Sequence, residues 1–541
     1  MKRPIAAAGR VRFVLFLGIL AAGIVSRVSY FGACIHDDAF ISFRYARNLV
    51  RGAGLVMNPG ERVEGYTNFL WTLLHAPIIA MGLDPALLAQ VLGALLSLVL
   101  IAGVYWFSER RLGGGWPALV APAFLSWNQG FVLESLSGLE TMAFATLVFA
   151  SWAAFLEERR GSRLRPGLWA VACGIATLVR PEGALVFASL AGWSLIGVAR
   201  GEPASRLRGA VLVYAVLVVP FLIWRTVYYG SWLPNTFYTK VGYTSAQVAR
   251  GWRFLKNNFA YSTTTAVLGT AVGFAVAGFL RSVRAEGVPH ARASATRWFA
   301  ARPRDEALAL ALLVAAVYCL YVMLVGGDYE PTNRFQIPVL PLVYLLFQEG
   351  LRTFTLLVRS SLRVATELAT ILAVAASIVC LLVSRQHFDH ILTQRHWPQA
   401  RRNHHAQLRA VGTWLHDNTP PNTVVAVSSI GALPWFADRP IVDMMGLTDR
   451  HIGHRHMPDM GKGPPGHEKG DGVYVLGRRP DVILFDKGHL FSTEVDRARV
   501  VEGARGVSEL EIARAPDFER DYELVRQPTP AGVLHSFARR P

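Results

Sequence analysis

Residues 11–30 read VRFVLFLGILAAGIVSRVSY, and residues 86–107 read ALLAQVLGALLSLVLIAGVYWF. Each is an apolar run of roughly 20 residues, the length that an α-helix needs to cross about 30 Å of hydrocarbon. Comparable runs follow at residues 139–155, 207–224, 306–325 and 364–384. Together they predict a mainly α-helical bundle that spans a membrane.

The overall composition agrees with this prediction. Of 541 residues, 52% are hydrophobic and 17% are charged, whereas an ordinary soluble domain has about 25% charged residues. The formal net charge is +17, but residues 385–541 contain nearly equal numbers of acidic and basic side chains. The basic surplus therefore lies between the apolar runs, where short cytoplasmic loops collect Lys and Arg. We expect membrane lipids as neighbours and no nucleic-acid partner.

The alternation of the loops predicts the topology. With a cytoplasmic N-terminus, the cytoplasmic side receives the basic loops 110–111, 159–165, 200–208, 281–304 and 352–363. The other side receives the acidic, mixed or aromatic loops 33–67, 128–138, 180–183, 226–259 and 326–334. This pattern predicts a multi-pass protein of the inner (plasma) membrane with about 11 transmembrane helices. Residues 68–83 are too short for a span, and we expect them to form an interfacial helix at the outer surface.

The character of the sequence changes after residue 384. Residues 401–417 have a helical pattern, residues 423–429 and 482–485 are β-branched apolar runs, and Gly and Pro separate them. We therefore predict a transmembrane domain at 1–384, with its first extracytoplasmic loop at 31–67, and a small extracytoplasmic soluble α/β domain at 385–541. The four cysteines are widely spaced and form no disulfide or zinc pattern.

The first outer loop holds the densest group of polar residues in the membrane half. It begins with His36, Asp37 and Asp38, directly after the first apolar run. Two adjacent carboxylates at a membrane boundary repel each other, and partial burial raises the pKa of at least one toward that of a useful general base. The alternative is that both carboxylates only cap the N-terminus of the following helix. The local pattern leaves both interpretations open.

Several outer-loop motifs carry a resemblance to a known family. They are HDDAFISFRYARNLVRGAGLVMNPGERVEGYTNFLW at 36–71, SGLET at 137–141, RPEG at 180–183, YYGSWLPNTFYTK at 228–240, GGDYEPTNRFQIPVLP at 326–341 and, more loosely, VDMMGLTD at 442–449. These motifs resemble the GT-C superfamily of polyprenyl-phosphate-dependent membrane glycosyltransferases, and within it the mycobacterial terminal arabinofuranosyltransferase-like branch. The resemblance spans most of residues 30–350, and the first-loop motif is its most specific part.

The resemblance implies an inverting transfer from a polyprenyl-phosphate-linked sugar to a hydroxyl of a cell-envelope glycan, lipid or protein. It also implies that an acidic residue just after the first span is the base, which corresponds to Asp37, with Asp38 as the second carboxylate. The departing lipid phosphate needs cations, and Arg44, Lys240 and Arg334 are the candidates. Lys240 and Arg334 could instead mark the membrane interface.

Two further carboxylates, Glu140 and Asp328, are candidates for binding sugar hydroxyls, although helix-end carboxylates are often caps. No metal or other cofactor is expected, since His451, His454 and His456 do not have the spacing of a zinc motif. The main alternative is a secondary transporter or flippase of a polar or lipid-linked substrate, with ionisable groups near the bilayer midplane. A single outer-boundary cluster of Asp37, Asp38, Lys240 and Arg334 favours the transferase.

Overall fold

The computed structural model describes residues 3–161, 166–261, 303–330, 332–362, 397–486 and 489–541. The helices of the N-terminal part are α1 (Arg3–Tyr30), α2 (Asp37–Val50), α3 (Phe69–Ala80), α4 (Pro85–Arg111), η1 (Trp116–Leu119), α5 (Val120–Trp127), α6 (Gln129–Glu134), α7 (Thr141–Arg159), α8 (Leu168–Val179), α9 (Gly183–Val198), α10 (Ala204–Tyr229), α11 (Asn235–Lys240), α12 (Ser245–Tyr261), α15 (Pro303–Leu324), η2 (Ile337–Val339) and α16 (Leu340–Leu362).

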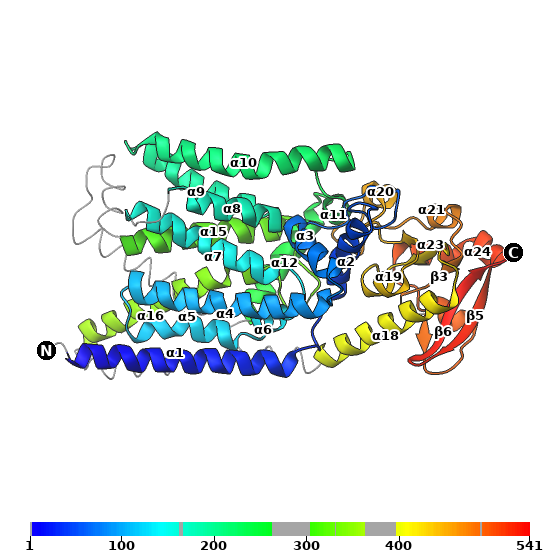
Figure 1. The fold of residues 1–541 in the computed structure, drawn as a ribbon, viewed down its shortest axis with the longest axis horizontal. Coiled ribbons are helices and arrows are strands. Elements are labelled where there is room, and N and C mark those ends of the chain that lie inside the picture. The colour runs from blue at the N-terminus through cyan, green and yellow to red at the C-terminus, as the bar shows by residue number, and fades with distance from the viewer. Residues whose placement is uncertain (1–2, 162–165, 262–302, 331, 363–396, 487–488) are drawn as a thin grey trace.

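The long helices α1, α4, α7, α10 and α15 run roughly along one direction and form a bundle (Figure 1). Helix boundaries follow local chemistry: the Asp84 carboxylate accepts the amide of Ala86 at 2.8 Å at the start of α4, and Gly230 ends α10 with a left-handed φ of 67°. The main core of the bundle consists of large apolar side chains, including Trp152, Phe144 and Tyr318. Because lipid tails are also apolar, close packing of these side chains, and not their removal from water, holds the helices together in a membrane.

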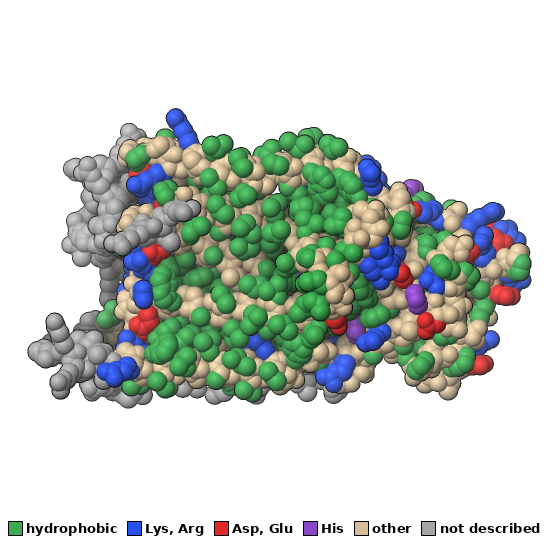
Figure 2. Space-filling view, viewed as in Figure 1, with side chains coloured by type: hydrophobic (Ala, Val, Ile, Leu, Met, Phe, Trp, Pro, Cys, Tyr) green, Lys and Arg blue, Asp and Glu red, His purple; other side chains and the backbone are tan. Residues whose placement is uncertain are grey.

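Within the described residues, four helices are long and apolar enough to cross a membrane: Gly9–Tyr30, Pro85–Arg111, Ala204–Tyr229 and Pro303–Leu324. They coincide with four of the predicted runs. The run at 139–155 corresponds to α7, the interfacial helix at 68–83 corresponds to α3, and the run at 364–384 lies outside the described residues. The predicted count of about 11 spans therefore stays a prediction. Figure 2 shows a broad apolar surface over the bundle with charged side chains at its two ends.

The predicted cytoplasmic loops meet at one end of the bundle. Arg12 pairs with Glu109 at 2.8 Å, and Arg352 donates to the carbonyl of Gly114 at 2.6 Å. These contacts join the ends of α1, α4 and α16, which lie together in Figure 1. The described residues next to the predicted basic loops 110–111 and 352–363 thus lie at one end of the bundle, whereas residues 281–302 lie outside the described residues.

The C-terminal segment, residues 397–541, follows at the opposite end. Its elements are α18 (Trp397–Asn418), β1 (Val425–Val427), α19 (Ala432–Ala437), β2 (Ile441–Asp443), α20 (Arg450–His454), α21 (Gly472–Gly477), β3 (Val482–Ile483), β4 (Leu490–Phe491), α22 (Arg497–Val501), α23 (Val507–Arg514), α24 (Pro516–Asp521), β5 (Tyr522–Thr529) and β6 (Gly532–Arg539). The strands form a mixed sheet in the order β2-β1-β3-β6-β4, with β5 paired to β6. β1 is parallel to β2 and β3, whereas β6 is antiparallel to its neighbours.

The first loop and the C-terminal segment share one apolar core. Phe43 and Tyr66 from the first loop are buried in the same cluster as Val425, Leu433 and Ile441. Burying these side chains together fixes the C-terminal segment against α2 and α3. The predicted boundary at 384/385 lies outside the described residues, and the described residues on its two sides pack as one unit.

Candidate functional site

The two adjacent carboxylates open α2, and they do not supply its cap. The N-cap residue is His36, whose Nδ1 accepts the backbone amide of Asp38 at 3.1 Å. The carboxylates of Asp37 and Asp38 therefore point to other partners, although their charge near the helix N-terminus remains favourable. The side-chain hydrogen bond of the cap thus comes from His36, while Asp37 and Asp38 place negative charge in the first turn of α2, as the capping interpretation expects.

Asp38 faces a buried arginine from the GGDYEPTNRF motif. Arg334 Nη1 donates to Asp38 Oδ2 at 3.0 Å, while Arg334 Nε and Nη2 donate to Asp328 at 2.6 and 3.3 Å. The Asp328 side chain is 3% exposed and the Asp38 side chain is 33% exposed. Burial opposes ionisation of Asp38, but the nearby cations of Arg334 and Lys240 hold the pKa of Asp38 well below its usual range. The Asp38 carboxylate is thus ionised and remains partly exposed.

Lys240 adds a second cation to this group. It ends α11, is partly buried, and lies within electrostatic reach of Asp38, Arg334 and Asp328. Its ammonium makes no hydrogen bond or ion pair with another described residue. Burial lowers the pKa of Lys240. An ammonium that is partly desolvated and unpaired in this part of the chain is suited to an incoming anion.

Next to Asp38 lies a buried chain of hydrogen-bonded and ion-paired side chains, which consists of His36, Glu330 and Arg401. The His36 Nε2 atom lies 2.9 Å from Glu330 Oε1, and Arg401 Nη2 donates to Glu330 Oε2 at 3.2 Å. Because His36 Nδ1 accepts a backbone amide, Nε2 carries the proton and donates to Glu330. Arg401 belongs to α18, so this chain ties the C-terminal segment to the start of α2. Sequence reasoning missed both Glu330 and Arg401; Glu330 stood inside a quoted motif, whereas Arg401 has no local signal.

Asp37 points to the C-terminal segment. Its Oδ1 accepts the backbone amide of Ala432 at 2.6 Å, at the start of α19. Gly431 is packed so closely there that an added Cβ would lie 2.6 Å from Asp37 Cγ. Burial raises the pKa of Asp37 to about 6, and the neighbouring charge of Asp38 acts in the same direction. The pair thus separates into one carboxylate with a depressed pKa and one with a raised pKa, as in sites that divide acid, base and electrostatic roles.

A second ion cluster joins the SGLET and RPEG motifs. Glu140 accepts Arg180 Nη1 at 2.9 Å and Asn68 Nδ2 at 2.7 Å, and Arg180 also pairs with Glu182 at 2.9 Å. The guanidinium carbon atoms of Arg180 and Arg334 lie 5.5 and 5.7 Å from the ring centroid of Phe335. Because both arginines lie near the Phe335 ring, the group of Glu140, Arg180 and Glu182 is next to the group of Asp38, Arg334 and Asp328.

Arg44 lies elsewhere, and its contacts do not favour the predicted role at the donor phosphate. Every nitrogen of its guanidinium donates to a backbone carbonyl: Nε to Met57 at 3.0 Å, Nη1 to Pro434 at 2.6 Å and Nη2 to Arg439 at 2.7 Å. Arg44 is 3% exposed and bridges α2 to the C-terminal segment. Its role is to hold the two parts together.

The histidines of the C-terminal segment are not gathered around one point. His451 stacks on Tyr474 and lies 3.0 Å from Asp471, whereas His454 packs against Tyr238. Among the described residues, no group of three or more His, Cys, Asp or Glu side chains is arranged to hold a metal ion.

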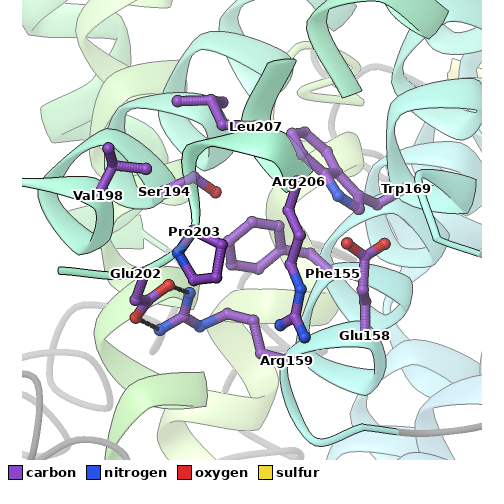
Figure 3. Close-up of a pocket in the computed structure, with 10 residues that line it drawn as sticks. All are labelled: Phe155, Glu158, Arg159, Trp169, Ser194, Val198, Glu202, Pro203, Arg206 and Leu207. Atoms are coloured by element: carbon purple, nitrogen blue, oxygen red, sulfur yellow. Dashed lines mark hydrogen bonds and ion pairs between the residues drawn. The ribbon is translucent and has the colours of Figure 1, made fainter. Parts of the chain in front are cut away.

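A pocket with an empty volume of about 420 Å³ lies far from Asp38, at the other end of α7. Figure 3 shows the residues that line it: Phe155, Glu158, Arg159, Trp169, Ser194, Val198, Glu202, Pro203, Arg206 and Leu207. Arg159 is held there by Glu202 at 2.8 Å. None of the residues around Asp38 lines this pocket, so it is separate from the candidate site.

Several known proteins and one protein family are similar to this chain. Residues 395–538 match a family described as "Domain of unknown function (DUF8728)". The chain is 28% identical over 349 residues to a terminal β-(1→2)-arabinofuranosyltransferase of Corynebacterium glutamicum, covering 60% of this chain and 49% of the relative. It is 30% identical over 248 residues to the protein of the same name from Mycobacterium tuberculosis, covering 42% and 38%. The chain thus spans about half or less of the length of these relatives.

Solved structures share the fold. ArnT from Cupriavidus metallidurans, bound to undecaprenyl phosphate, superposes with a TM-score of 0.50 at 14% identity, covering 81% of this chain and 86% of ArnT. The apo oligosaccharyltransferase of Archaeoglobus fulgidus gives a TM-score of 0.50 at 13% identity, covering 97% and 74%. With its apolar helices and these neighbours, the chain is an integral membrane protein. The relatives and the shared fold confirm the resemblance to the GT-C superfamily and, within it, to the terminal arabinofuranosyltransferase-like branch.

Proposed function

We propose that this protein is a membrane glycosyltransferase that moves a sugar from a polyprenyl-phosphate donor to a hydroxyl group of a cell-envelope glycan, lipid or protein. The observation that carries the proposal is the convergence of Asp38, Arg334, Asp328 and Lys240, which come from three distant outer-loop motifs. A transporter or flippase would not require this group of two carboxylates, Asp38 and Asp328, beside two cations at one boundary.

The donor phosphate binds between Lys240 and Arg334. The phosphate gains negative charge as the anomeric carbon–oxygen bond breaks, and the two cations stabilise that charge in the transition state more than in the ground state. Asp328 holds the Arg334 guanidinium by two hydrogen bonds, so the cation needs no reorganisation. Asp328 is therefore a positioning residue for Arg334, and its sugar-binding role is secondary in this proposal.

Asp37 accepts the proton of the acceptor hydroxyl. The acceptor oxygen forms a bond to the anomeric carbon, the bond to the lipid phosphate breaks, and the proton moves to the Asp37 carboxylate, so a single displacement inverts the configuration. The raised pKa of about 6 suits a base at neutral pH. Asp38 stays ionised and fixes Arg334. In this proposal Glu140, which Arg180 and Asn68 hold, binds a hydroxyl of the sugar.

The names of the relatives suggest which substrates to test first. Both are terminal β-(1→2)-arabinofuranosyltransferases, and ArnT was solved with undecaprenyl phosphate. We propose a polyprenyl-phosphate-linked pentose or hexose as donor, with arabinofuranose as the first choice. The site lies on the extracytoplasmic face of the inner membrane, with the N-terminus in the cytoplasm.

The test uses purified protein in lipid nanodiscs with synthetic polyprenyl-phosphate-linked pentoses and hexoses and short oligosaccharide acceptors. Mass spectrometry should detect a product one sugar longer, with free polyprenyl phosphate released in equal amount. Arg44→Lys serves as the matched control for Arg334→Lys, because both residues are buried arginines and only Arg334 is proposed to bind the donor. Movement of intact lipid-linked sugar across the membrane, without transfer, would favour the flippase instead.

A further inference from the structure

One loop of the C-terminal segment reaches back to the cation site. Residues 461–470 read GKGPPGHEKG and connect α20 to α21. Their Gly and Pro content predicts a loop, but the structure gives this loop fixed anchors on α12. Arg250 Nη1 donates to the carbonyl of Gly463 at 2.7 Å and to Glu468 Oε2 at 2.8 Å.

The Glu468 carboxylate also forms hydrogen bonds within the loop. Glu468 Oε1 accepts the amides of Gly461 and Gly463 at 2.7 and 2.8 Å. The Arg250 and Glu468 side chains are 12% and 4% exposed, so this clamp is shielded from water. The loop is thus held in one conformation against the membrane part.

The tip of the loop touches two residues of the site. An added Cβ on Gly466 would lie 3.3 Å from Lys240 Cε, and Gly466 has a left-handed φ of 79°. The ring of the next residue, His467, packs edge-on against Tyr329 with centroids 4.8 Å apart. Tyr329 is itself within electrostatic reach of Asp38. The loop therefore forms a wall beside Lys240 and Tyr329.

One ring nitrogen of His467 is available to accept a hydrogen bond. Its Nδ1 lies 3.0 Å from the carbonyl of Pro465, which fixes Nδ1 as the donor. Nε2 is then an acceptor, and it makes no hydrogen bond with another described residue. The ring is only partly buried, so a sugar hydroxyl can reach it.

The position of the loop indicates which of the two substrates, the donor or the acceptor, contacts it. The C-terminal segment, from which the loop comes, lies beyond α11 at one end of the helical bundle (Figure 1). The lipid chain of a polyprenyl-phosphate donor would lie in the membrane, along the bundle. Resting on the proposed function, we infer that the 461–470 loop forms the acceptor side of the site. His467 accepts a hydrogen bond from an acceptor hydroxyl and so helps to set acceptor specificity.

The test compares kinetic constants for two substrates in the full-length protein. His467→Phe keeps an aromatic ring on Tyr329 but removes Nε2, so the acceptor KM should rise by about three- to tenfold, the loss of one neutral hydrogen bond. The donor KM should not change. His467→Gln, which can place an amide oxygen near the Nε2 position, should recover part of the loss. Lys462→Ala is the matched control, because Lys462 lies in the same loop and is 69% exposed.

The outcomes separate this inference from the proposed function. An unchanged acceptor KM in His467→Phe overturns the inference while transfer by the wild-type protein still supports the function. Equal increases in donor and acceptor KM also overturn it, because the loop would then act only through Lys240. A wild-type protein that transfers no sugar refutes the proposed function itself.

Discussion

Lys240 and Arg334 are both proposed to bind the donor phosphate, yet the structure predicts different consequences of their loss. The Lys240 ammonium pairs with no described residue, whereas Arg334 holds Asp328 and Asp38. Replacing Lys240 with Met keeps the apolar stem and removes only the charge. A charge-assisted contact contributes about 1.5–3 kcal/mol, so Lys240→Met should weaken donor binding by about 10- to 150-fold. Its unfolding temperature should stay close to that of the wild type.

Arg334→Met should impair binding and also destabilise the protein. Asp328 is 3% exposed and would keep a buried charge without its cation, a change that costs about 3–5 kcal/mol. Asp38 is 33% exposed and adds less, because water can solvate it. The free energy of unfolding should therefore fall in Arg334→Met and not in Lys240→Met.

Two measurements check this contrast: binding of polyprenyl phosphate by native mass spectrometry, and thermal unfolding in the same detergent. Arg44→Met is the control, since it should destabilise the junction of α2 with the C-terminal segment and leave the intrinsic affinity of folded protein unchanged. Wild-type affinity in Lys240→Met would refute its role at the phosphate and leave it as an interfacial lysine.

Three further predictions concern the carboxylates and their surroundings. Burial raises the pKa of Asp37 to about 6, so kcat/KM should rise with pH through about 6 and then level off, and Asp37→Asn should lose this limb. Gly431→Ala should reduce transfer, because its Cβ would lie 2.1 Å from the Asp37 carbonyl oxygen, whereas Gly477→Ala, with open space, should not. Despite burial, His36 lowers the pKa of Glu330 to about 2. The stability that Glu330 contributes is complete above its ordinary pKa and is lost as the pH falls through about 2. Glu330→Gln should therefore lower the unfolding temperature at pH 7, and the difference should narrow below about pH 4.

The sequence predicted that several residues of the candidate site lie in loops on the same side of the bundle. Asp38, Lys240 and Arg334 were each placed on one face by the alternation of basic loops, and the structure brings them together. The family motifs pair with one another in the same way, as Glu140 and Arg180 do. Such convergence is predictable because a membrane restricts loops to two faces.

The contacts that the sequence did not predict all involve residues of the C-terminal segment. Arg44 was assigned to the phosphate because it stood in a charged motif, but two of its three carbonyl partners are nearly 400 positions away. Arg401 and His467 lie in a segment whose local pattern indicates only a helix and a loop. Tertiary contacts of this kind leave no periodic signal, because each residue is chosen by a partner that is distant in sequence.

The most direct test of the account is the rate of sugar transfer by purified Asp37→Asn protein. The asparagine oxygen can still accept the amide of Ala432, and the cap of α2 comes from His36, so the variant should fold with a near-wild-type unfolding temperature. Transfer should fall by about 10²- to 10⁴-fold, the contribution of a positioned general base. Asp38→Asn, which weakens the hold on Arg334, should show a smaller loss. A folded Asp37→Asn protein that transfers sugar at near the wild-type rate would contradict the assignment of Asp37 as the base.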